Sequence, residues 1–229
     1  MPSIPAVMRL LQFGDSMLPV GSFSFSNGLE SAVQQKVVRD LETLRQFVLT
    51  AVRQAATSDG IAVLEAFRAF VENDADRITR ADRAVFNRKL NEEMRTMTVR
   101  MGRKLAEMAE KVAPSPQVAD WLASIKRGDT PGTYPVAQAL VFASLGLSES
   151  DAFAVHQYGL ASMMLGASLR LLKVSYLDAQ AFLFAINGEA EVAYARVANS
   201  SLDDMAVYAP VIDVLAAIHV QANVRMFMN

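Results

Sequence analysis

The sequence predicts an all-α protein: a single globular domain over residues 1–229, with about eight to ten helices around a buried central apolar helix. Apolar residues make up 52% of the chain and charged residues 20%, a balance that favours a folded domain with a sizeable core. Apolar residues also recur at helical spacing along most of the chain. The stretch that alternates with a period of two, residues 22–26 (SFSFS), is too short for a convincing strand and lacks a partner run.

Capping residues and glycines divide the first half of the chain into helices. Asp, Ser and Gly stand where apolar periodicity begins or ends, which is their usual place at helix termini. The expected elements are a helix ending near Gly14, a loop over 14–28, a helix from Leu29, a helix capped by Asp40, a helix capped by Ser58 or Asp59, and two helices or one broken helix over 75–108.

Prolines and further capping residues divide the second half in the same way. Pro114 and Pro116 end the charged region, since proline interrupts a helix that precedes it. The elements expected after them are a short helix around Trp121, a loop over 128–135, a helix over 136–145, the central helix capped by Ser148 and running to about Lys173, a helix from Asp178 to about Val197, and a last helix from about Pro210 that fades near Phe227.

The central helix needs a test against a membrane span, because residues 152–169 contain no Asp, Glu, Lys or Arg. The same stretch carries His156, Gln157 and two glycines, so we expect a buried helix of a soluble domain. Residues 1–13 show no signal peptide. We therefore expect a cytoplasmic protein with no membrane partner.

Composition and motifs exclude several classes of active site. The net charge of -2 offers no basic field for nucleic acid, so we expect no nucleic-acid partner. The chain has no cysteine, no phosphate-binding loop, no Gly-x-Ser-x-Gly elbow and no His-Glu-x-x-His motif. Of its two histidines, His156 is predicted to be a hydrogen-bonded core residue, and His219 to have a capping or interface role. We expect no catalytic residue and no stably bound metal or cofactor.

Two segments have two possible interpretations each: a purely structural role or a role in binding another protein. The loop over 14–28 reads either as a structural turn or as a partner surface anchored by Phe23 and Phe25. On the central helix, Gly159, Ser162, Gly166 and Arg170 share one face, which indicates either ordinary helix packing or a subunit interface.

One long run near the N-terminus comprises residues 10–12 (LLQ), 15–16 (DS) and 18–30 (LPVGSFSFSNGLE). This run resembles the N-terminal signature of the urease accessory protein UreF family, and the similarity covers nearly the whole chain. Weaker resemblances follow in order at 100–103 (RMGR), at 134–136 (YPV), around Arg170, and in the C-terminal segment with Asp203, Asp204, Asp213 and His219. Arg225 and Phe227 also match the family pattern.

This resemblance implies a non-enzymatic scaffold of all-α fold that forms a homodimer. It would join a UreD/UreH-type accessory protein, recruit a UreG-type GTPase and dock on apo-urease, with nickel handled by the complex. The residues expected to bind partners are Phe23, Phe25, Glu30, Tyr134, Arg170, Asp203, Asp204, His219, Arg225 and Phe227. The segment from His219 onward is expected to order on binding the UreD/UreH-type partner.

Two other classes remain open at this point. A stand-alone helical adaptor or regulator would need no urease. A helical enzyme that uses His156 with a carboxylate should show a pocket with a perturbed titrating group.

Overall fold

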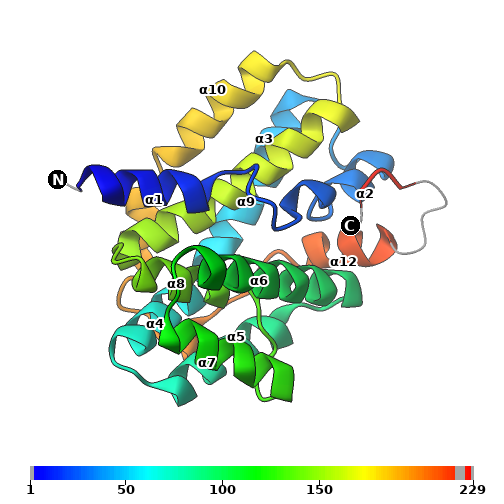
Figure 1. The fold of residues 1–229 in the computed structure, drawn as a ribbon. Coiled ribbons are helices and arrows are strands. Elements are labelled where there is room, and N and C mark those ends of the chain that lie inside the picture. Colours follow the sequence, from blue (N-terminus) through cyan, green and yellow to red (C-terminus); the bar gives the residue numbers. More distant parts are fainter. Residues whose placement is uncertain (1–2, 220–224, 228–229) are drawn as a thin grey trace.

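The computed structural model describes residues 3–219 and 225–227, and within them it contains helices and no strand (Figure 1). The expected all-α class is confirmed. The α-helices are α1 (Ile4–Gly14), α2 (Leu29–Gln34), α3 (Leu41–Thr57), α4 (Asp59–Val71), α5 (Ala75–Arg88), α6 (Glu92–Val112), α7 (Pro116–Arg127), α8 (Tyr134–Ser144), α9 (Glu149–Leu171), α10 (Tyr176–Asn187), α11 (Ala190–Val197) and α12 (Pro210–His219), with 3-10 turns η1 (Ser22–Ser24) and η2 (Leu202–Asp204).

The described residues therefore form twelve α-helices, more than the eight to ten expected. Part of the difference lies in residues 178–197, where one helix was expected and the structure has two. Gly188 ends α10, and the N–H of Glu189 bonds to the carbonyl of Ile186 before α11 begins. The charged stretch is also two helices, because Asn91 caps α6 through a bond from the Met94 N–H to its side chain.

Side-chain caps explain several other helix starts. The Asp40 carboxylate accepts from the N–H of Thr43 at 2.9 Å at the start of α3. The Ser148 hydroxyl accepts from the N–H of Asp151 at 3.1 Å at the start of α9, and Asp151 bonds back to Ser148. These caps satisfy N–H groups that a helix terminus leaves without intrahelical partners.

Helices α8 and α9 lie at the centre of the fold. The sequence analysis expected one buried central helix, the one capped by Ser148, which is α9. Residues 135–142 of α8 are all buried, and α8 packs against α4, α6 and α9. Helix α9 contacts α3, α4, α8 and α10, but part of its circumference is open: a Cβ added at Gly159 or Gly166 would meet nothing within 4 Å. Helix α9 is thus central in the fold, whereas α8 is the helix buried on all sides.

A buried carboxylate holds the loop that precedes α8. Asp82 of α5 is fully buried and accepts from the N–H groups of Gly132 and Thr133 and from the hydroxyls of Thr130 and Thr133, at 2.5–2.7 Å. On the other side, Gly102 of α6 lies so close that a Cβ there would stand 2.7 Å from the Thr133 carbonyl oxygen. The loop is therefore fixed between α5 and α6.

Helix α12 lies beside α2 and α6, at the end of the molecule where the described C-terminal residues also lie (Figure 1). Leu215 and Ile212 of α12 join the core cluster formed by α2, α3, α9 and α10. In the part of the chain that the structure describes, no helix is long and apolar enough to cross a membrane. This arrangement brings the N-terminal loop, α2, α9 and the described residues 225–227 into one region.

Candidate partner-binding site

Six of the ten residues predicted to bind partners come together in one region. They come from the N-terminal loop, α2, α9, the end of α12 and the described C-terminal residues, and they are Phe23, Glu30, Arg170, His219, Arg225 and Phe227. The structure adds Glu93 of α6 to this group. Sequence reasoning missed Glu93, because no spacing rule links it to His219, 126 residues further on.

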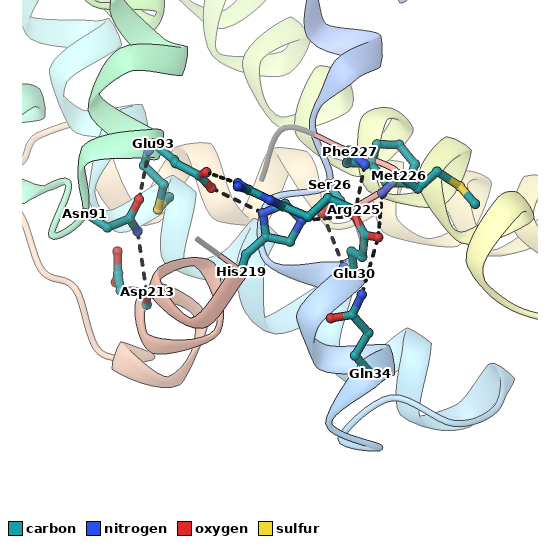
Figure 2. Close-up of polar contacts among 11 residues, drawn as sticks. Ser26, Glu30, Gln34, Asn91, Glu93, Asp213, His219, Arg225, Met226 and Phe227 are labelled. Carbon is teal, nitrogen blue, oxygen red and sulfur yellow. Dashed lines mark hydrogen bonds and ion pairs between the residues drawn. The ribbon is translucent and has the colours of Figure 1, made fainter. Parts of the chain in front are cut away.

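Glu30 is the buried acceptor at the centre of this group (Figure 2). Its carboxylate accepts from the backbone N–H groups of Met226 at 2.8 Å and Phe227 at 2.9 Å, and lies 3.0 Å from Nε2 of His219. Burial raises the pKa of Glu30, but the two amides and His219 outweigh burial, so its pKa is lowered overall. Glu30 is therefore a carboxylate that holds the C-terminal residues against α2.

His219 lies fully buried between two carboxylates, with Nδ1 at 3.2 Å from Glu93 and Nε2 at 3.0 Å from Glu30 (Figure 2). Carboxylate oxygens only accept hydrogen bonds, so the imidazolium form, which donates from both nitrogens, satisfies both contacts. Arg225 donates from Nη1 to Glu93 at 2.8 Å. Two carboxylates, an imidazole and a guanidinium thus meet here, and we name these four residues the His219 cluster.

Arg170 connects this cluster to an exposed aromatic surface. Its guanidinium carbon lies 4.2 Å from the centre of the Phe23 ring and 4.1 Å from that of Phe227. These distances are typical of cation–π contacts. Phe23 is 68% exposed, whereas Phe227 is buried. Phe23 and the guanidinium of Arg170 thus form a surface patch that rests on the anchored C-terminal residues.

The other four predicted residues lie outside this group. Phe25 is only 6% exposed and packs in the core with Phe13 and Val20, so any effect it has on a partner surface is indirect. Burial raises the pKa of Tyr134 to about 12, and its backbone N–H donates to Thr98. Asp203 and Asp204 are exposed in η2, a turn that packs against α4.

A cavity of about 350 Å³ runs from the patch into the protein between α1, α6, α9 and α12. Its lining is largely apolar, with Arg170 and Phe23 at one part and His156, Asp59 and Lys89 at another. Pockets of this size and composition are the usual places for ligands to bind.

The polar end of the cavity contains unpaired groups. Lys89 Nζ donates to Asp59 Oδ2 at 2.6 Å. The other oxygen of Asp59 and both ring nitrogens of His156 find no hydrogen-bond partner among the described residues. Burial lowers the pKa of His156 to about 4, so its ring is neutral at pH 7. His156 is a core residue as expected, but its expected hydrogen bond within the described chain is missing.

The described residues contain no group of three or more His, Asp or Glu side chains that could hold a metal ion. In the His219 cluster the acidic and imidazole groups are already engaged with one another and with Arg225. The arrangement is suited to holding chain segments together and to presenting a cationic and aromatic surface to another protein.

Comparison with known proteins gives a consistent family relation. The UreF family model matches residues 38–187. A protein named urease accessory protein UreF 2 from Brucella canis is 54% identical over 227 residues, which cover 99% of this chain and 93% of the relative. Urease accessory protein UreF 1 from Brucella melitensis is 53% identical over the same length, covering 94% of that protein. Urease accessory protein UreF from Yersinia enterocolitica is 52% identical over 223 residues, covering 97% of this chain and 98% of that protein.

Proposed function

Because this chain belongs to the UreF family of urease accessory proteins, we propose that it is a non-enzymatic scaffold for the insertion of nickel into apo-urease. In this proposal it joins a UreD/UreH-type accessory protein and a UreG-type GTPase in the cytoplasm and docks with them on apo-urease. The observation that carries the proposal is the Arg170 patch, where the exposed Arg170 guanidinium and the exposed Phe23 ring rest on the hydrogen-bonded C-terminal residues of the His219 cluster.

Exposed apolar side chains support a protein-binding role. Ile4 is 81% exposed on α1, Met17 78% in the following loop, and Phe184 83% on α10. Large side chains of this kind contribute most to binding when a partner buries them. The open faces of α9 and α10 are where we propose that a second copy of the chain binds to form the homodimer.

Nickel is cargo in this proposal and is not a resident cofactor. A carrier that releases its metal to the next protein needs weak and transient ligands, since a tight site would retain the ion. The cavity has no cysteine in its lining, and its polar side chains offer oxygen and nitrogen atoms, which is compatible with that requirement.

The helical-enzyme alternative is the one competing function for which the structure offers an observation. The cavity does contain a titrating group with a perturbed pKa, His156. However, an imidazole with a pKa of about 4 is a weak base at pH 7, and the neighbouring Asp59 is paired with Lys89. The scaffold function is therefore favoured, and the family relation does not favour a stand-alone adaptor.

Arg170→Ala tests the scaffold function directly. Co-expressed with urease and the other accessory proteins, it is expected to lower urease activity and urease nickel content at least fivefold, because the patch loses its cation. Arg196→Ala is the matched control: Arg196 is exposed on α11, away from the patch, and its replacement should leave both quantities unchanged. Full activation with Arg170→Ala would remove the patch from the function, and full activation without this chain would end the proposal.

A further inference from the structure

Helix α12 forms one wall of the cavity, and side-chain hydrogen bonds are made at both of its ends. Ile212 and Asp213 line the cavity, while Val211 and Val214 on the outer side are more than half exposed. At its N-terminal end, the N–H groups of Tyr208 and Ala209 donate to the Oε1 of Gln54. At its C-terminal end, His219 enters the cluster with Glu30 and Glu93.

Between these ends, Ile212 and Leu215 of α12 pack in the core cluster of α2, α3, α9 and α10, and the Asp213 carboxylate accepts from the backbone N–H of Leu90. The helix packs against α2 and α6, and the residues before it, 206–208, are exposed and without regular structure. Asn91 donates to the Asp213 carbonyl oxygen at 3.5 Å, which is the outer limit for a hydrogen bond (Figure 2). A ten-residue helix spans about 15 Å. A rotation of α12 about its Gln54 end therefore displaces the His219 end more than any other part of the helix.

The wall faces the polar end of the cavity. Asp213 is buried and close enough to Lys89 and Asp59 to feel both charges. Moving α12 outward would therefore uncover the groups that have no partner in the described residues, His156 and the free oxygen of Asp59. Buried polar groups of this kind gain free energy from contact with water or a polar solute.

We propose that α12 is a movable wall of this cavity and that the His219 cluster is the latch that keeps it closed. The latch consists of charge-assisted hydrogen bonds, which are stronger than neutral ones, so neutralising Glu93 weakens its bonds to both His219 and Arg225. It joins α12 to α2 through Glu30 and to α6 through Glu93. This inference concerns the chain itself and does not depend on the proposed role in urease activation.

Cysteine labelling tests the latch cleanly, because the chain has no native cysteine. Met94→Cys places one thiol on α6 in the cavity wall, at a position only 6% exposed. Val155→Cys places a thiol in the same cavity at the α1 side, where Val155 contacts Gly14. Each reporter is combined with Glu93→Gln, which breaks the latch at a partly exposed residue, or with Glu92→Gln, its exposed neighbour outside the cluster.

The rate of reaction with a small disulfide reagent is the readout. Glu93→Gln is expected to raise the rate at Met94→Cys about tenfold or more, while Glu92→Gln leaves it unchanged and Val155→Cys reacts at its original rate throughout. Hydrogen exchange should in parallel become faster at residues 212–216 of α12 and stay the same at 136–142 of α8. Equal rates at Met94→Cys in the two glutamine variants would overturn the latch. An equal rise at both thiols would also overturn it, because it would show general loosening instead of movement of one wall.

Discussion

Glu30 illustrates how single residues of this chain take their roles from distant parts of the sequence. From the sequence it is an acidic residue at the start of a short helix, where the helix dipole favours a carboxylate. In the structure it also binds the backbone of residues 226 and 227, almost two hundred positions away. His219 and Glu93 likewise become hydrogen-bond partners only because the fold brings α12 and α6 together. The sequence shows that these side chains are charged or titratable, but it does not show which residues they hydrogen-bond to.

His156 makes the stability of the protein dependent on pH. Its folded-state pKa of about 4 lies below the 6.5 of a free imidazole, so between these values only the unfolded chain takes up the proton. Stability therefore falls as the pH drops through this window. At pH 5 the loss from this residue is about 2 kcal/mol relative to pH 7.

Urea denaturation at pH 7 and pH 5 measures this effect. His156→Phe removes the titrating ring, so the difference in unfolding free energy between the two pH values should shrink by about 2 kcal/mol relative to the parent chain. Acidic residues elsewhere contribute equally to both proteins and cancel in the comparison. An unchanged difference would mean that His156 is already charged or hydrated in the folded protein.

At the scale of elements, the sequence predicted helices well where caps and periodicity agree. Asp40 and Ser148 mark helix starts as expected, and α6 begins after Asn91 within a stretch that was expected to break. The break between α10 and α11 was missed, because Gly188 stands inside an apolar pattern that continues across it. Burial was harder to predict than helix boundaries. Helix α9 lacks charged residues over most of its length, yet one of its faces is open, because the fold places no neighbouring element against Gly159 and Gly166.

Gly102 and Gly159 form a matched pair that tests packing between elements. Alanine at Gly102 would place a Cβ against the backbone of Gly132 and Thr133, which Asp82 holds in place. We expect Gly102→Ala to lower the unfolding free energy by about 2 kcal/mol, because overpacking against backbone outweighs the gain in helix propensity. Gly159 faces open space, so Gly159→Ala should leave stability unchanged or raise it by up to about 1 kcal/mol.

Urea denaturation midpoints of the two variants test whether the Gly102 contact is tight, since both variants place the same methyl group inside a helix. If Gly102→Ala were tolerated as well as Gly159→Ala, the loop before α8 would be free to shift. The close contact of α6 with that loop would then contribute little to the fold.

At the scale of the whole molecule, residues 23–30 and the described C-terminal residues come together at one place. The N-terminal loop supplies Phe23, α2 supplies Glu30, and the C-terminal residues supply Arg225 and Phe227. The family signature made the N-terminal loop conspicuous, and the resemblance pointed to the C-terminal segment, but each was an isolated stretch. Their meeting depends on the path of α9 and α12 through the fold, which no local pattern encodes.

The contact of Glu30 with residues 226 and 227 leads to a prediction about partner binding. The segment from His219 onward was expected to order when the UreD/UreH-type partner binds, and residues 220–224 and 228–229 of that segment lie outside the described residues. In the described part, the Met226 and Phe227 amides already donate to Glu30, although Met226 itself is 57% exposed.

A partner that covers Met226 removes water from these bonds, and bonds shielded from water open less often. Hydrogen exchange at the amides of Met226 and Phe227 should therefore slow at least tenfold on adding the UreD/UreH-type protein. The amides of α7, far from the site, should not change. Equal protection at residues 226 and 227 with and without the partner would show that the C-terminal anchor serves only to hold the fold together.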